Sequence, residues 1–347
     1  MTPTSSSAPG RPAAERRGLR RRLSDNLTAL LAIGALKLIL HMPDRPIWAL
    51  ADAAGAISYR VSADRRDRAR RNLRRILEWM AANGRGPESY RAAAADPQAL
   101  EALVRSAFKH HAAYNVELAR APRFTESWVA ERLDVENPVE VDAWLTRDKA
   151  LILIGMHFGA IEVPGIFAIH HVGRMVSPME TVANARVQRY ILSTRDTIGI
   201  TIVTLEEAVT RLLAALRNNE AVGLVADRNL TPGGIEVELF GAPTKIPAGP
   251  VLLAAETGAP AYMSAVRRIG PGRYRGRVRE LPPPAGANRR ERSRAMAREE
   301  ARLFEEFIVD APEQWLALFH PIWPDLELRD AKLAQPQPQP REDGDHA

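Results

Sequence analysis

Between residues 149 and 281, short apolar runs alternate with longer amphipathic stretches, and this rhythm constrains the fold more than any other feature of the chain. The run at 150–156 (ALILIGM) is short and wholly apolar, which is typical of a strand buried on both faces. Further strands are expected at 173–178, 200–204 and 221–226, and helices at 160–171, 183–198 and 205–218. Strands and helices that alternate with short connections predict an α/β fold with a mostly parallel central sheet flanked by helices.

The segments on either side of this region define the expected boundaries. Past a turn at 231–234 we expect strands at 235–240, 260–268 and 273–281, and helices at 248–258 and 289–309; residues 98–120 also look helical. We predict a single domain over 23–325, divided into membrane-associating helices at 23–60, a helical part at 61–148 and an α/β core at 149–325. Low-complexity composition predicts disordered tails at 1–22 and 326–347.

The first 75 residues are strongly basic and contain the most apolar stretch of the chain. They carry sixteen basic and six acidic residues, a balance of +10, whereas the remainder has a balance of −4. The apolar stretch at 27–42 (LTALLAIGALKLILHM) is shorter than the roughly 20 residues that span a bilayer. We therefore expect a helix that lies in an anionic membrane surface, with a buried core helix as the alternative.

A second basic run, at 60–75, contains eight arginines. On a helix, Ala69, Leu73 and Ile76 would form a thin apolar stripe, so the run is compatible with a solvated helix or with a phosphate-facing surface near the membrane. Aromatic residues do not interleave with these arginines and no recognition motif is present. We therefore expect no nucleic acid as a partner.

The composition excludes several chemistries. The chain has no cysteine, which rules out disulfides, thiol nucleophiles, cysteine–zinc sites and iron–sulfur clusters. Histidines with metal-ligand spacing are also missing, so we expect no metal and no bound cofactor. With 46% hydrophobic and 26% charged residues, the chain can bury a sizeable core.

The strand predicted at 150–156 leads directly into His157, and Glu162 follows five residues later. Ligands of open α/β sheets bind beyond the carboxyl ends of the strands, which is where His157 is placed. If His157 lies in the turn before the next helix, the Glu162 carboxylate can hold one ring nitrogen and raise the basicity of the other. The pair then suits removal of a proton from a bound alcohol, although a histidine at a strand end can also be purely structural.

Several ordered motifs carry a family resemblance over roughly residues 25–325. They are GMHFGAIE at 155–162, PME at 178–180, RDTIG at 195–199, ADRN at 226–229, GIEVELFGAPT at 234–244, IPAGP at 246–250, PEQW at 312–315 and PIWP at 321–324. With these motifs the chain resembles the lysophospholipid acyltransferase-like superfamily, in the branch of bacterial lipid A acyltransferases and phosphatidylinositol mannoside acyltransferases. The glutamate at 162 resembles the lipid A enzymes, whereas the wording at 234–250 is nearer to the mannoside enzymes.

The resemblance implies a glycerolipid acyltransferase-like fold and transfer of a fatty acyl chain to a hydroxyl of a membrane glycolipid. The donor would be a thioester, acyl-CoA or acyl-carrier protein, and the favoured acceptor a phosphatidylinositol mannoside, with lipid A precursors as the alternative. Matched positions imply catalytic roles for His157, Glu162 and Glu236, and substrate-binding roles for Glu180, Arg195, Asp227 and Arg228.

The same resemblance places the protein at the cytoplasmic face of a bacterial plasma membrane, as a peripheral or monotopic protein. An apolar tunnel for the acyl chain is expected, but its lining cannot be told from ordinary core residues in the sequence. A non-catalytic lipid-binding protein with this fold stays open as an alternative.

Overall fold

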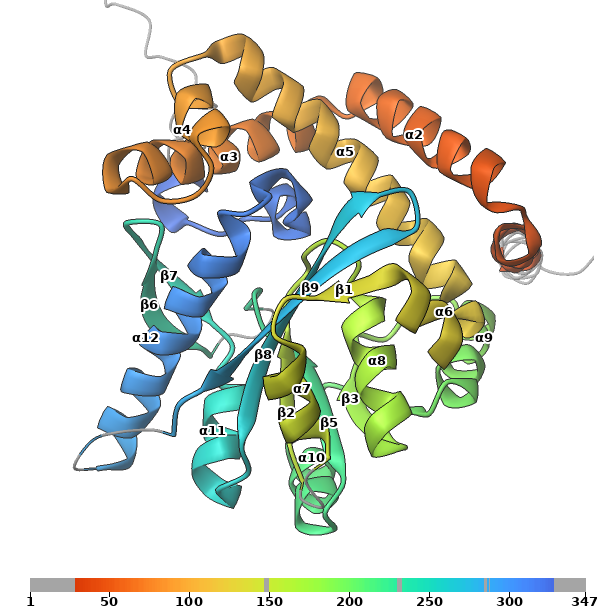
Figure 1. Ribbon diagram of the computed structural model, residues 1–347, viewed down its shortest axis with the longest axis vertical. Helices are drawn as coiled ribbons and strands as arrows, with labels where there is room; N and C mark the ends of the chain where they lie inside the picture. The colour runs from red at the N-terminus through yellow and green to blue at the C-terminus, as the bar shows by residue number, and fades with distance from the viewer. Residues whose placement is uncertain (1–28, 147–149, 230–232, 284–285, 287, 328–347) are drawn as a thin grey trace, which may run out of the picture.

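The computed structural model describes residues 29–146, 150–229, 233–283, 286 and 288–327 (Figure 1). A seven-stranded sheet runs through its centre in the order β1-β9-β8-β2-β5-β3-β4. The strands are β1 (Leu133–Val135), β2 (Ile152–Gly155), β3 (Met175–Pro178), β4 (Ile200–Val203), β5 (Ala221–Val225), β8 (Ala261–Gly270) and β9 (Arg273–Leu281). Strands β8, β2, β5, β3 and β4 run parallel, while β9 is antiparallel to β8. The prediction of a mostly parallel sheet in an α/β fold is confirmed.

Helices cover both faces of this sheet. Along the central strand β2 the side chains point alternately to the two faces, and those on both faces are apolar, so each face needs a covering layer. Ile152 and Ile154 pack in a core cluster with helices α10, α11 and α12, whereas Leu151 and Leu153 pack toward α7 and α8. The helices that flank the sheet are α6 (Glu126–Arg132), α7 (Pro138–Leu145), α8 (Glu162–Val172), α9 (Ala185–Thr197), α10 (Ala208–Arg217), α11 (Gly249–Thr257) and α12 (Arg289–Ile308). Figure 1 shows them on the two sides of the strands.

A separate hairpin, β6 (Ile235–Leu239) and β7 (Ala242–Ile246), packs against α12. The sequence predicts the first of these strands but not the second. Phe240 and Gly241 make the turn with φ values of +50° and +72°, a geometry that suits a tight hairpin. Pro243 is accommodated because a strand in a two-stranded hairpin has one free edge.

The first third of the chain forms a layer of helices at one end of the sheet (Figure 1). It consists of a helix over residues 29–41, α2 (Asp44–Val61), α3 (Ala63–Asn83), α4 (Glu88–Ala93) and α5 (Pro97–Arg120). The stripe predicted on the arginine-rich helix is confirmed, since Ala69, Leu73 and Ile76 of α3 are fully buried. Helix α5 starts at an Asp96 cap, whose carboxylate accepts two backbone N–H bonds.

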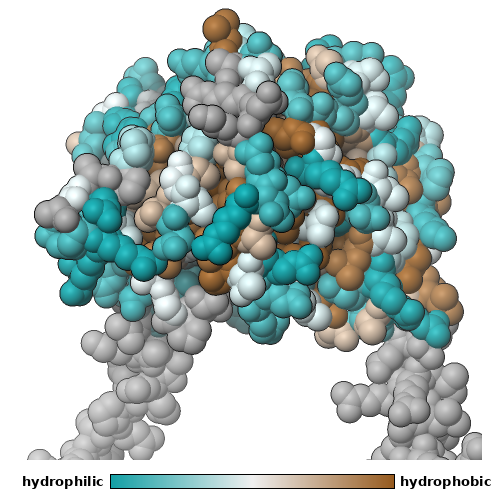
Figure 2. Space-filling model, turned by 90° about the horizontal axis from the view of Figure 1, so that it is seen from below, coloured by the Kyte–Doolittle hydropathy of each residue, from teal (hydrophilic) through white to brown (hydrophobic). Residues whose placement is uncertain are grey.

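Among the described residues, no helix combines the length and the apolar character needed to cross a bilayer. The tail predicted at 1–22, residues 328–347 of the tail predicted at 326–347, and the first two residues of the apolar stretch at 27–42 lie outside the described part of the chain. Leu326 and Glu327, the first residues of the predicted C-terminal tail, are described as helical, and Leu326 is buried. Hydrophilic side chains cover most of the face seen from below in Figure 2, where apolar side chains form small separate patches.

Candidate active site

Two neighbouring strands place the central residues of the site. Strands β2 and β5 are parallel and in register, with Gly155 beside Val225, so both end at the same edge of the sheet. The pairing continues for one more step, because the N–H of Ala226 donates to the carbonyl of Gly155 at 3.1 Å. His157 follows β2 by two residues and Asp227 follows β5 by two residues. Equal spacing after adjacent parallel strands therefore brings the two side chains together.

The Asp227 carboxylate holds the His157 side chain in place. Its Oδ1 lies 2.7 Å from Nδ1 of His157, and its Oδ2 accepts the backbone N–H of His157 at 3.0 Å and the indole N–H of Trp315 at 2.8 Å. Burial alone would raise the pKa of Asp227, but attraction to His157 and the hydrogen bonds that it accepts lower that pKa below its usual value. An ionised carboxylate only accepts hydrogen bonds, so Nδ1 carries a proton, and the lone pair of the neutral ring is then on Nε2.

The turn that carries His157 is braced by two other segments. The backbone carbonyl of His157 accepts the N–H of Leu316, and the N–H of Gly159 donates to the carbonyl of Gln314 at 3.0 Å. Gly159 has a φ of +52°, and a Cβ there would lie 2.1 Å from the carbonyl oxygen of Val266. Only glycine lets the turn approach β8 this closely. The imidazole is thus fixed at its base while its side chain stays 22% exposed.

Arg228 lies on the open side of the imidazole. One terminal nitrogen is 3.4 Å from Nε2 of His157, and the other donates to Nε2 of His320 at 2.8 Å. Burial, followed by repulsion from Arg228 and His157, lowers the pKa of His320 to about 4, so this histidine is a neutral acceptor near pH 7. The guanidinium therefore presents donors beside the lone pair of His157, where negative charge would be stabilised.

The predicted contact between Glu162 and His157 is wrong. Glu162 is the first residue of α8, and its carboxylate forms a two-pronged ion pair with Arg195 of α9. Both side chains are largely buried, with 11% and 9% exposure. The rotation of α8 turns Glu162 toward α9, so this pair joins two helices. Arg195 was predicted to bind substrate, but its guanidinium instead pairs with Glu162.

Glu180 and Glu236, which were also predicted to belong to the site, lie at the surface. Glu180 follows β3 and is exposed. Glu236 was expected to assist near His157, but it lies on the outer face of β6, where it is 83% exposed and 3.9 Å from Lys245. Side chains alternate along a strand, and Val237, its neighbour, takes the buried face of the hairpin.

Two contributors to the site were not predicted as functional residues. Trp315, the last residue of the PEQW motif, is fully buried, and its indole N–H donates to Asp227. His320 gave no signal in the sequence, because its partner Arg228 is 92 residues away. Asp227, predicted to bind substrate, instead holds His157. The predicted positions of His157, Asp227 and Arg228 just after parallel strands were the signal in the sequence that pointed to this edge of the sheet.

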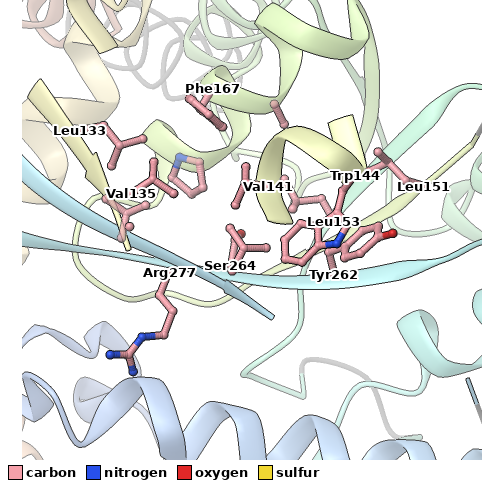
Figure 3. A pocket seen from close by; sticks show the side chains of 15 residues that line it. Leu133, Val135, Val141, Trp144, Leu151, Leu153, Phe167, Tyr262, Ser264 and Arg277 are labelled. Carbon is pink, nitrogen blue, oxygen red and sulfur yellow. The ribbon is translucent and has the colours of Figure 1, made fainter. Parts of the chain in front are cut away.

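An apolar cavity of about 40 Å³ lies on the α7–α8 side of the sheet. Figure 3 shows side chains from β1, β2, α7, α8 and β8 converging on it, among them Leu133, Val141, Leu153, Phe167 and Tyr262. Its wall reaches the turn that carries the imidazole, because Val266 lines the cavity and its carbonyl accepts the N–H of Ala160 at 2.9 Å.

A histidine held by a buried carboxylate at the carboxyl edge of a mostly parallel sheet defines an α/β protein equipped for general acid–base chemistry. No group of metal-binding side chains was found in the described part of the chain. The chain belongs to the bacterial lipid A biosynthesis acyltransferase family, whose model matches residues 17–324.

Similarity to individual proteins points to one branch of this family. A phosphatidylinositol mannoside acyltransferase from two strains of Mycobacterium tuberculosis is 30% identical over 196 residues, covering 55% of this chain and 57% of that protein. The protein of the same name from Mycolicibacterium smegmatis is 29% identical over 161 residues, covering 45% of this chain and 53% of that protein. The matched stretches thus span little more than half the length of these relatives.

Proposed function

We propose that this protein transfers a fatty acyl chain from a thioester donor to a hydroxyl of a membrane glycolipid, with His157 as the general base. The observation that carries the proposal is the contact of 2.7 Å between Nδ1 of His157 and Asp227, which places the lone pair of the neutral ring on Nε2 of a partly exposed side chain. The family supports the reaction class. Acyl-CoA and acyl-carrier protein are the candidate donors.

In the proposed reaction, Nε2 of His157 takes the proton of the acceptor hydroxyl while its oxygen attacks the thioester carbonyl. The carbonyl electron pair moves to oxygen, and the N–H donors of Arg228 stabilise the resulting oxyanion. When the tetrahedral intermediate collapses, the C–S bond breaks and the imidazolium returns its proton to the leaving thiolate. Asp227 stabilises the imidazolium between these steps.

The apolar cavity is our candidate for the acyl chain. One of its lining residues, Val266, is hydrogen-bonded to the turn that carries His157, and its lining is almost entirely apolar. At about 40 Å³ it is smaller than a fatty chain, so we expect the chain to enter by displacing side chains of α7 and α8. The expected tunnel would then open with the substrate.

The acceptor we propose is a phosphatidylinositol mannoside-type glycolipid. The named relatives from two mycobacterial species support this choice, while the family description keeps a lipid A precursor as the second candidate. Both acceptors offer a sugar hydroxyl to the same base. Their comparison in one assay is therefore part of the test below.

We propose that the protein binds the cytoplasmic face of the bacterial plasma membrane through its first helices, as a peripheral or monotopic protein. Leu50, Ile57 and Val61 lie on one side of α2 and are each more than half exposed. Leu31 and Leu38 of the preceding helix are exposed to a similar degree. Exposed large apolar side chains repeated at helical spacing beside a basic segment suit an anionic lipid surface.

The decisive experiment compares wild type with His157→Ala in transfer of a radiolabelled acyl group. Palmitoyl-CoA and palmitoyl-carrier protein serve as donors, and a phosphatidylinositol mannoside and a lipid A precursor as acceptors. General base catalysis contributes roughly 10²–10⁴-fold, so the variant should lose activity by that factor. His171→Ala, a histidine at the exposed end of α8, serves as the matched control.

Unchanged turnover by His157→Ala would refute the base assignment. Absence of transfer by the wild type, together with binding of the glycolipid, would favour the alternative of a lipid-binding protein. Faster transfer to the lipid A precursor than to the phosphatidylinositol mannoside would make the lipid A precursor the favoured acceptor.

A further inference from the structure

A buried ion pair holds the turn that carries His157. Arg268 of β8 donates through one terminal nitrogen to the carbonyl of Gly159 at 2.7 Å. The same guanidinium forms a two-pronged pair with the carboxylate of Glu117 on α5, in which Nε donates to Oε1 at 2.7 Å. Arg268 is 8% exposed and Glu117 is fully buried. The proposed reaction uses neither side chain.

The backbone of Arg268 is fixed as firmly as its side chain. Its N–H donates to Oε1 of Gln314 at 2.8 Å, and its carbonyl accepts the side-chain N–H of the same residue at 2.9 Å. The main-chain carbonyl of Gln314 in turn accepts the N–H of Gly159. The peptide group after Gly159 is held on both sides, by Arg268 at its carbonyl and by Val266 at the N–H of Ala160. These bonds together leave the turn one orientation.

Stability alone does not explain a charged pair at this place. Taking two charges out of water is costly, and apolar residues of similar volume stabilise a buried site as well or better. Burial raises the pKa of Glu117, and Arg268 opposes that shift by attraction and hydrogen bonds. An apolar pair could not supply a donor for the buried carbonyl of Gly159. The planar fork of an arginine can serve a carboxylate and a carbonyl at the same time.

We propose that Glu117 and Arg268 are positioning residues for His157. Glu117 aims the guanidinium, and the guanidinium fixes the carbonyl of Gly159. The turn then sets how closely the imidazole approaches Asp227. Both residues act through the backbone of the turn, and their effect on turnover rests on the proposed function of His157 as the base.

The expected loss follows from the narrow tolerance of a catalytic geometry. Without Arg268, the buried carbonyl of Gly159 has no donor, which is costly enough to shift the turn toward a new partner. A displacement of about 1 Å can cost on the order of 10²-fold in rate. We expect kcat to fall by about tenfold to a hundredfold, with KM changed by less than about threefold, because the substrates keep their own contacts.

The key variant replaces both charges at once, Glu117→Met with Arg268→Met, so that no single charge stays buried. Acyl transfer from a labelled thioester gives kcat and KM for the full-length protein. The ¹H–¹⁵N NMR signal of Nδ1–H of His157 is recorded without substrate. A ring proton held against a carboxylate resonates far downfield, so the signal should move upfield as the contact with Asp227 lengthens.

Arg279→Met with Glu306→Met is the matched control. It removes an ion pair of 3.0 Å between β9 and α12 and should keep the kcat and the NMR signal of the wild type. Arg268→Lys is the second variant, since it keeps a charge opposite Glu117 but lacks the fork that reaches Gly159. It decides by the same two readouts if the double variant fails to fold.

A folded double variant with an unmoved His157 signal, or with a loss of kcat smaller than about tenfold, would overturn the inference. The NMR signal needs no turnover. If the wild type transfers no acyl group, the proposed function fails, and the signal alone then decides whether the ion pair positions His157.

Discussion

Replacing Asp227 by asparagine tests the arrangement around His157 most directly. Its Oδ2 accepts two donors, the backbone N–H of His157 and the indole N–H of Trp315. An asparagine must therefore place its carbonyl oxygen at that position and its NH₂ group opposite Nδ1. Since the NH₂ group only donates, Nδ1 must accept and the ring proton moves to Nε2. The base would then carry a proton where it needs a lone pair.

The expected loss follows from this exchange of tautomers. A carboxylate that holds the catalytic histidine in the correct tautomer is worth on the order of 10⁴-fold in kcat when it is changed to the amide. We expect Asp227→Asn to lower kcat by about 10³–10⁴-fold with little change in KM, because shape and packing are kept. The assay is acyl transfer from a labelled thioester, and ¹⁵N NMR of the histidine rings reports the tautomer. Asp196→Asn, at an exposed position on α9, is the matched control.

Two results would contradict this reasoning. One is an Asp227→Asn variant that keeps more than a tenth of wild-type kcat with its fold intact. The other is an NMR spectrum in which Nδ1 of His157 still carries the proton in a variant that has lost activity. The second result would move the cause of the loss from the tautomer to some other property of the carboxylate.

Three further changes probe stability and packing. Glu300 is fully buried, its two carboxylate oxygens have no hydrogen-bond partner among the described residues, and burial raises its pKa well above 4.5. The stability of the wild type should therefore fall as the pH rises above about 4.5, by up to about 1.4 kcal/mol per pH unit. Glu300→Met should be more stable and show a flatter pH profile in urea unfolding. Gly159→Ala should lower both the melting temperature and activity, because its Cβ would meet the carbonyl of Val266 at 2.1 Å. Glu162→Gln leaves the buried Arg195 without its counter-charge and should destabilise the protein by about 3–5 kcal/mol in the same unfolding assay, whereas a large loss of kcat without loss of stability would restore a catalytic role for Glu162.

The sequence predicted six of the seven strands of the central sheet, because these strands are recognisable from their local pattern. Strand β1 was missed: it has only three residues and lies within the part at 61–148 that was expected to be helical. Runs such as 150–156 and 221–226 are short, apolar and bounded by turns, and both became central parallel strands. Strand β7 was missed because Pro243 argues against a strand and because its pairing depends on a hairpin turn with positive φ at Phe240. A local sequence pattern therefore identifies a strand that is buried on both faces. It does not identify a strand that is stabilised mainly by pairing with one partner strand.

The centre of the site could be located from the sequence, but its partner could not. His157 was predicted in the turn after a buried strand, where the structure places it. The choice of Glu162 followed nearness along the chain, while the actual partner Asp227 is 70 residues away. The contact between His157 and Asp227 depends on β2 lying next to β5, and the order of the strands is set by packing of the whole sheet. Local spacing carries no information about that order.

The geometry around Arg228 explains how a cation can sit beside the proposed base without blocking it. Its contact to Nε2 of His157 is long, at 3.4 Å, whereas its contact to His320 is 2.8 Å. An incoming hydroxyl can therefore displace the weak contact while the strong one keeps the guanidinium in place. His320 can serve as this anchor only while it is neutral, which its lowered pKa secures near pH 7. Arg228 then stays within reach of the thioester carbonyl oxygen, which becomes negative when the acceptor oxygen attacks the carbonyl carbon.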